Sequence, residues 1–454
     1  MDSSSGDESG KVYDFKDSKT SGVVTVTKLW DDSMSNDERP VPDISISTEK
    51  PSKNPLGYTI TYHGNGLTFA DGSSENEIIV NNSGKIVSGQ YELPGNTAVT
   101  WYLDSQCTSK IKTDNNGLPL SGIFSDLDLY AKPKTFLLKG YNSSEDLNEF
   151  SYLIPSTATS IVFTAEAMPT SAVLIDVDAD GDGGVVAWMD GTTMKVSTQI
   201  SGQKIIAPSN SECMFSELNK VLSINLSNLD TSNVTTMEAM FYFCRRLTTI
   251  DLTPLNTSNV TSMNEMFRGC SGMTSLDLTP LDTNNVTDIS GMFHGCSGLT
   301  NLDLTPLDNG LVTDMSRMFY NCKRLANLNL TPLSTSNVTN MSSMFSECSG
   351  LTSLDLTHLD TQKVTNMSGM FYNCSNLTSL NLASLDTSKV SNMKYMFSYC
   401  TALTTLSLGE KFAFVGSDYY LPKGIWYSSN GTAYTSDGTT CTIPNNKADT
   451  YTRR

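Results

Sequence analysis

The sequence predicts a repeat solenoid with a parallel β-sheet, and two observations point to this fold class. The pair Met-Phe recurs with a fixed period of 26 residues, without a single insertion or deletion. A fixed period between roughly 20 and 50 residues is typical of solenoids, in which each unit buries its apolar face against its neighbours. Each copy also contains the motif L-x-L, whose alternation of apolar and polar residues is typical of a strand. The Met-Phe pairs begin at Met214, Met240, Met266, Met292, Met318, Met344, Met370 and Met396.

One copy, starting at Met266, shows which positions are expected to face the core. We expect each copy to contribute one short parallel strand at L-x-L, and to return through a turn and a brief helical or 3₁₀ segment. Eight such coils would form a rod of roughly 38 Å at the spacing of parallel strands. The inward residues of this copy are Met266, Phe267, Cys270, Met273, Leu276, Leu278, Leu281, Val286 and Ile289.

The order of residues within a copy resembles a known repeat family. The pattern L-x-x-L-x-L-x-x-L-D-T-S-x-V-T-x-M, preceded by M-F-x-x-C, is clearest in residues 351–367 and 377–393. It is similar to the BspA-like leucine-rich repeats. The resemblance implies a right-handed leucine-rich-repeat solenoid, and a surface protein of a bacterium or protist that is implicated in adhesion.

Two segments before the repeats resemble modules of bacterial surface proteins. Residues 22–30 (GVVTVTKLW) resemble the opening strand of Cna B-type domains, in which the strand lysine, here Lys28, can form an isopeptide bond. Too few residues follow for that whole domain, so we expect no such bond. Residues 57–132 resemble an internalin-type B-repeat, a small β-grasp module, although Thr100 stands where that family has glycine. The matching landmarks are Tyr58–Tyr62, Trp101–Asp104 and Leu127–Ala131.

Six segments are therefore predicted along the chain. A solenoid needs a cap at each end to cover its apolar edge, and Phe412, Phe414, Trp426 and Tyr434 are expected to cover the last coil. The segments are a disordered leader at 1–21, a Cna B-like strand and linker at 22–56, the B-repeat-like module at 57–135, a β-rich linker and N-terminal cap at 136–212, the solenoid at 213–408, and a C-terminal cap at 409–454.

Charge and hydropathy exclude several classes of partner. The chain has 48 acidic and 30 basic residues, a formal net charge of −18. Without a basic stripe we expect neither nucleic acid nor an anionic membrane surface as partner. No apolar segment reaches about 18 residues, so we expect no membrane insertion. No signal peptide or wall-sorting motif is visible, so we expect a trimmed cell-surface or secreted ectodomain; a cytosolic chain is the alternative.

Seven of the ten cysteines follow the same period and are expected to form one stacked column. They could form disulfides or bind metal, or they could be small apolar residues in a tight core. We favour the second interpretation, because the first copy has Leu218 in this position and no histidine accompanies the cysteines. The cysteine column consists of Cys244, Cys270, Cys296, Cys322, Cys348, Cys374 and Cys400.

The segment DVDADGD imitates the start of a calcium-binding loop. Asp176, Asp178, Asp180 and Asp182 would supply ligands at positions 1, 3, 5 and 7, with Gly181 at position 6. The twelfth position, usually Glu, is Ala187 in that register. An acidic turn between two strands is the interpretation we favour, so we expect no cofactor.

Two sets of surface positions are candidates for ligand binding. The polar residue within L-x-L, for example Asp251, Asp277 or Asp303, recurs as a column that could bind a ligand but is also typical of a solvated face. The positions flanking the cysteine differ between copies and contain exposed Tyr, Phe and Arg, the residue types that anchor interfaces. We favour a binding patch there, with neutral drift as the alternative. Its residues are Tyr242, Phe243, Arg245, Arg246, Tyr320, Lys323, Arg324, Tyr372 and Tyr399.

No set of residues suitable for catalysis is visible, because the three histidines (His63, His294 and His358) are scattered and no nucleophile motif occurs. We therefore expect a monomeric, adhesin-type surface protein that binds an extracellular host or bacterial protein, or a glycan, rather than an enzyme. The alternatives are a structural spacer or wall-layer component without a specific ligand, and a module ordered by calcium or a glycan.

Overall fold

The structure is a computed structural model that describes residues 13–16, 23–26, 57–81, 85–94, 98–113, 117–120, 123 and 125–454. The chain divides into two compact units, residues 1–57 and 58–454. In the first unit, β1 (Tyr13–Lys16) pairs antiparallel with β2 (Val23–Val26). β1 lies within the predicted leader and β2 within the Cna B-like strand. Lys28 and its isopeptide bond lie outside the described residues.

In the second unit, the predicted B-repeat-like landmarks form one five-stranded mixed sheet. The first landmark is β3, which pairs antiparallel with β4 and parallel with β7. The side chains of Tyr62 and Trp101 pack at its centre, with ring centroids 4.8 Å apart. The strands are β3 (Tyr58–His63), β4 (Glu75–Val80), β5 (Ile86–Ser88), β6 (Val99–Tyr102) and β7 (Leu127–Pro133), in the order β5-β4-β3-β7-β6.

The N-terminal cap is joined to the repeats by parallel pairing. Asn148 caps the short helix α1 by accepting from the amides of Phe150 and Ser151. Strand β10 then pairs with β14 of the first copy, in a four-stranded sheet of order β11-β12-β10-β14. The elements are β8 (Tyr141–Asn142), β9 (Leu147–Asn148), α1 (Glu149–Leu153), β10 (Ser160–Thr164), β11 (Val186–Asp190), β12 (Thr193–Ser197), β13 (Ile205–Ile206), β14 (Ser223–Asn225) and β15 (Leu229–Asp230).

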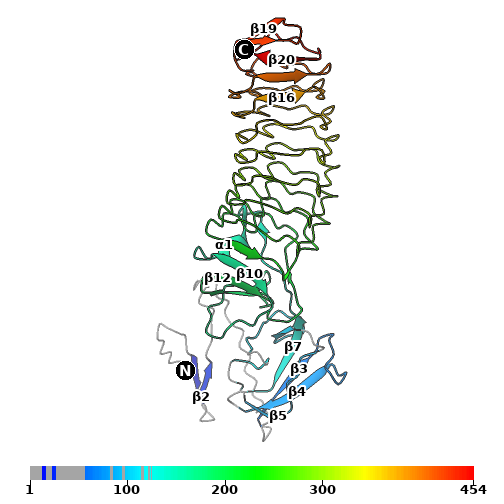
Figure 1. Ribbon diagram of the computed structural model, residues 1–454. Coiled ribbons are helices and arrows are strands. Elements are labelled where there is room, and N and C mark those ends of the chain that lie inside the picture. The colour runs from blue at the N-terminus through cyan, green and yellow to red at the C-terminus, as the bar shows by residue number, and fades with distance from the viewer. Residues whose placement is uncertain are drawn as a thin grey trace. The chain divides into compact units, whose positions relative to one another are not determined.

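Residues 209–408, here called the repeat stack, pile copy upon copy (Figure 1). A parallel bridge joins equivalent residues of successive copies, so the predicted repeat fold is confirmed. The right-handed sense and the solenoid of eight coils stay predictions. The bridged residues are Asn210, Thr236, Ser262, Asp288, Asp314, Asn340, Asn366 and Asn392.

The predicted strand at L-x-L is wrong for most copies. Among the described residues of the stack, this segment is a strand only in β14, β16 (Ser379–Leu382) and β17 (Thr405–Leu408). In central copies the amides beside it lie at the limit of bonding, 3.3 Å from Thr274 N to Thr248 O and 3.5 Å from Ala326 N to Thr300 O. The well-formed ladder instead passes through the Met-Phe segment, where Phe267 donates to the carbonyl of Met292 over 3.0 Å.

The Met-Phe segment is built from consecutive turns rather than from the predicted helical or 3₁₀ stretch. Two residues in each copy, immediately before Met and two after Phe, have a positive φ. Gly269 (φ 75°) and Gly291 (φ 61°) occupy such positions, and so do Phe243 (φ 52°) and Tyr399 (φ 61°). A left-handed residue at each point interrupts the helical path, so the segment turns in steps.

The cysteine column is buried, as the favoured interpretation predicts, and its seven thiols are free in the structure. It also has a bonding role, because each thiol donates to the carbonyl of a Phe in the preceding copy, over 2.9–3.2 Å. Burial raises the pKa of the Cys244 thiol to about 12 and that of Cys322 well above its usual value. The side chains are therefore neutral donors at ordinary pH.

A column of buried hydroxyls forms a second set of bonds between copies. Thr335 donates through Oγ1 to the carbonyl of Asp360 and accepts from the amide of Asp360, at 2.9 and 2.7 Å. Asn309 makes the same two bonds to Ser334 with its amide group. Equivalent positions are held by Thr231, Thr257, Thr283, Thr361 and Thr387, all buried.

A five-stranded sheet covers the other end of the stack. Its order is β16-β17-β20-β18-β19, with β18 (Gly424–Tyr427), β19 (Ala433–Ser436) and β20 (Asp449–Arg453) coming from the predicted cap. Phe412 and Trp426 are buried in the same core as the repeats, and Phe414 and Tyr434 pack against it half-buried. No helix within the described residues is long and apolar enough to span a membrane.

Candidate functional site

The residues predicted to form a binding patch lie along one edge of the stack. This aromatic–basic edge is defined by the two positions after Met-Phe and the two after Cys. Met and Phe are buried, whereas the four basic residues after Cys and Tyr399 are exposed and the other members of the edge are half-buried. Its members are Tyr242, Phe243, Arg245, Arg246, Arg268, His294, Tyr320, Lys323, Arg324, Tyr372 and Tyr399.

The first part of the edge is a cluster of stacked rings and guanidinium groups. The rings of Tyr242 and Phe243 meet edge to face, with centroids 4.4 Å apart. The Arg245 guanidinium lies 4.7 Å from the centre of the Phe243 ring, and that of Arg268 lies 5.3 Å from the Tyr242 ring. Phe243 fits there because the next copy has Gly269, whose added Cβ would lie 2.2 Å from the ring.

The second part of the edge is centred on Tyr320. Its ring lies 4.5 Å from that of His294, and its hydroxyl donates to Glu347 Oε1 over 2.9 Å. The rings of Tyr372 and Tyr399 lie 5.4 Å apart. Burial, with Arg268 nearby, lowers the pKa of His294 to about 4, so its imidazole is neutral at ordinary pH.

The charge on the edge is positive, in contrast to the net charge of the chain. Arg245, Arg246, Lys323 and Arg324 are exposed, and none of the salt bridges between described residues includes them. Arg268 pairs with Glu265 within the stack. The unpaired cations favour a partner with acidic groups.

The structure connects part of the predicted patch and adds residues that the sequence analysis missed. Phe243 contacts both Tyr242 and Arg245, whereas among the described residues no ring contact is found for Arg246, Lys323 or Arg324. Arg268 joins the first part through Tyr242, and His294 joins the second through Tyr320. They occupy the position directly after Met-Phe in the copies between those of Tyr242 and Tyr320. The 26-residue period could therefore have identified them from the sequence.

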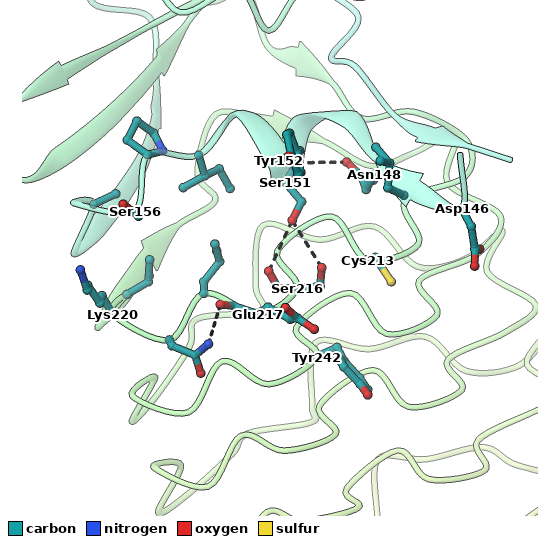
Figure 2. A pocket seen from close by; sticks show the side chains of 17 residues that line it. Asp146, Asn148, Ser151, Tyr152, Ser156, Cys213, Ser216, Glu217, Lys220 and Tyr242 are labelled. Atoms are coloured by element: carbon teal, nitrogen blue, oxygen red, sulfur yellow. Dashed lines mark hydrogen bonds between the residues drawn. The ribbon is translucent and has the colours of Figure 1, made fainter. Parts of the chain in front are cut away.

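A recess lies next to Tyr242, between α1 and the first copy (Figure 2). It encloses about 540 Å³ and is lined by Tyr152 and Pro155 from the cap and by Glu217 and Lys220 from the stack. Cys213 also lines it, and burial together with nearby carboxylates raises the pKa of this thiol to about 11. The recess thus offers mixed apolar and charged contacts but no activated nucleophile.

The acidic loop brings together three of the four predicted aspartates. Ligand atoms of Asp178, Asp180 and Asp182 lie within 4.8 Å of one another. Asp176, predicted as the first ligand, instead pairs with Lys139 over 3.3 Å. Ala187 is buried in β11. The predicted register is therefore wrong by two residues, because strand pairing places Asp176 outside the cluster.

The polar column within L-x-L has a local structural role. Asp303 Oδ1 accepts from the amide and hydroxyl of Thr305, at 3.0 and 2.7 Å, and Asp251, Asp277 and Asp355 likewise accept from the amide two residues later. These bonds to Thr305 lower the pKa of the Asp303 carboxyl. Each acid stabilises its own turn, which favours the solvated-face interpretation.

Comparisons with known proteins centre on the repeats. Residues 209–324 and 299–408 match a family model described as Mycoplasma protein of unknown function, DUF285. A leucine-rich repeat protein from Bacteroides ovatus is similar over 57% of this chain and 72% of that chain, at 16% sequence identity and a TM-score of 0.28. No curated protein matches the chain. The family match over the repeats supports in part the predicted leucine-rich-repeat type.

Proposed function

We propose that the protein is displayed on or secreted from a bacterial cell and binds an extracellular protein or glycan through the aromatic–basic edge. The observation that carries this proposal is a set of three groups of contacting side chains along the edge, around Phe243, Tyr320 and Tyr372. BspA-like leucine-rich repeats, forming a right-handed solenoid of eight coils, would be the scaffold. The protein would act as a monomer and without catalysis.

The edge has the properties of an interface that loses little entropy on binding. Phe243 is fixed by a turn whose backbone is bonded to the next copy, and the turn of Tyr399 is bonded through the amide of Phe397 to Tyr419 in the C-terminal segment. Ring contacts restrict Tyr242 and Tyr372 further. Side chains that are already ordered need not be immobilised when a ligand binds.

The charge of the edge favours an acidic ligand. Arg245 and Arg246 lie three copies before Lys323 and Arg324, a separation of roughly 14 Å at the spacing of parallel strands. An elongated partner with regularly placed carboxylate or sulfate groups would reach both pairs. The half-buried Tyr320 and Tyr372 and the exposed Tyr399 would stack on its apolar faces.

The recess beside Tyr242 would extend the same binding surface. It contains an exposed Tyr152 and the charged side chains of Glu217 and Lys220. A ligand that lies along the edge could place one terminal group there.

An array of extracellular proteins and anionic glycans, probed with the intact chain, tests the proposal. The matched variants are Arg245→Ala/Arg246→Ala/Lys323→Ala/Arg324→Ala and a control, Lys363→Ala/Lys389→Ala, whose lysines are exposed elsewhere on the stack. We expect ligands that the intact chain and the control bind and the edge variant loses. Equal binding by all three proteins would place the ligand site outside the edge and contradict the proposal, and binding by none of them would favour a structural spacer.

A further inference from the structure

The acidic loop before β11 contains a buried carboxylate oxygen without a partner. Asp178 is only 2% exposed. Its Oδ2 accepts from the amide of Gly183 over 2.6 Å, whereas no described residue donates to its Oδ1. A buried ionised oxygen without a donor is strongly unfavourable, unless a cation binds it.

One carboxylate oxygen from each of Asp178, Asp180 and Asp182 lies within 4.8 Å of the others, and bonds from outside the cluster hold the side chains of Asp180 and Asp182. Thr135 donates through its hydroxyl to Asp180 Oδ2 and through its amide to Asp182 Oδ2, at 2.9 and 2.7 Å. The amide of Gly184 donates to Asp182 Oδ1 over 2.7 Å. Each carboxylate oxygen has two lone pairs, so these bonds fix the side chains and leave lone pairs for an ion.

The nearby lysines do not neutralise the three acids directly. Lys134 donates to the carbonyl of Gly183 over 3.0 Å, and Lys110 donates to that of Gly181. Neither forms an ion pair with the three aspartates among the described residues. Burial, the largest influence on Lys134, lowers the pKa of its amine.

The residues also follow a calcium-loop register that differs from the one predicted from sequence. Counting from Asp178, the acids fall at positions 1, 3 and 5, and Gly183 falls at position 6 with a φ of 78°. Position 6 of such loops requires glycine for a sharp turn. Position 12 is Met189, so the bidentate carboxylate is missing.

We propose that Asp178, Asp180 and Asp182 bind one calcium ion. The donor set consists of oxygen atoms alone, which suits a hard cation. The irregular loop geometry favours calcium over magnesium, which requires near-octahedral coordination. Without a twelfth-position carboxylate, we expect a dissociation constant of about 0.1–1 mM, the range of extracellular calcium modules.

Calorimetric titration and thermal unfolding of the full chain with calcium chloride, magnesium chloride and EDTA test this proposal. We expect one calcium ion to bind and the unfolding temperature to rise with calcium, with a smaller rise for magnesium. The variant Asp178→Asn should lose the calcium-dependent rise. It should still unfold cooperatively, because the substitution removes a buried charge. The control Asp176→Asn should retain the full response, because Asp176 pairs with Lys139.

Three outcomes would overturn the proposal. The first is an unfolding temperature that calcium at about ten times the expected dissociation constant leaves unchanged. The second is a calcium response that persists in Asp178→Asn, and the third is a magnesium response equal to that of calcium. None of these results bears on ligand binding by the aromatic–basic edge.

Discussion

The thiol of Cys322 donates a hydrogen bond to the backbone carbonyl of Phe293, 3.2 Å away in the preceding copy. The same bond joins each cysteine of the column to a Phe 29 residues earlier. The same carbonyl also accepts from the amide of Cys296 over 3.0 Å within its own turn. The cysteine therefore fills a tight apolar position and adds a second hydrogen bond, between copies, to a backbone acceptor, which Leu218 in the first copy cannot do.

The burial of these thiols predicts which cysteines react. A maleimide or iodoacetamide should modify only Cys107, Cys213 and Cys441 in the folded protein, since these are partly exposed and the column is buried. In denaturant all ten should react. Mass spectrometry of peptides from the two samples measures this, and rapid native labelling of the column would contradict the packing described above.

Alkaline pH should destabilise the protein. An ordinary thiol titrates near pH 9, and burial raises the pKa of Cys244 to about 12, so the unfolded chain loses its protons first. The contribution of the cysteine column to the free energy of unfolding is complete below pH 9. It falls as pH rises toward 12, by about 1.4 kcal/mol per pH unit for each thiol. Urea unfolding under reducing conditions at about pH 8 and about pH 10 measures it. The free energy of unfolding of Cys322→Ala should depend less on pH. An unchanged pH dependence in this variant would argue against titration of the buried thiols as its cause.

Removal of one hydroxyl from the buried threonine column should be costly. Thr335→Val leaves both the amide and the carbonyl of Asp360 without their partner, and we expect a loss of about 3 kcal/mol in the free energy of unfolding. Thr335→Ser keeps both bonds and should lose about 1 kcal/mol for the methyl group. Equal losses in the two variants would show that packing, and not hydrogen bonding, matters at this position.

The two left-handed positions of a copy should tolerate alanine unequally. Gly369→Ala adds a Cβ near only Ser343 Oγ (3.1 Å) and Tyr372 Cβ (3.8 Å), so we expect a loss of about 1 kcal/mol from its positive φ. Gly269→Ala also displaces the Phe243 ring, and we expect about 3 kcal/mol. Denaturant unfolding of both variants tests this. A Gly269→Ala protein as stable as Gly369→Ala would mean that Phe243 is not packed against Gly269.

The sequence analysis succeeded where side-chain type determines the position. The Met, Phe and Cys of the copies are buried as predicted, and so are most of the leucines, although Leu276 and Leu328 in central copies are only partly buried. It failed where hydrogen bonds and ion pairs between distant segments determine which side chains come together. The acidity of DVDADGD could not show that Lys139 pairs with Asp176 and leaves Asp178 as the first acid of the cluster.

Two further features depended on contacts between copies. The sequence analysis assigned no role to Thr335 and its equivalents, and only the stacked structure shows that they bond to the backbone of the next copy. The L-x-L alternation predicted strands, but copy-to-copy amide bonds there are too long in the centre of the stack. Arg268 and His294 extended the predicted edge once the turns had placed successive copies side by side.

The most direct test of ligand binding by the edge is the affinity of the intact chain for the strongest array ligand, measured by biolayer interferometry. The account predicts that Arg245→Ala/Arg246→Ala/Lys323→Ala/Arg324→Ala weakens binding at least about tenfold, since each exposed charge pair contributes up to about 1 kcal/mol. Lys363→Ala/Lys389→Ala should bind as the intact chain does. An edge variant with unchanged affinity, while its unfolding temperature is also unchanged, would contradict the account.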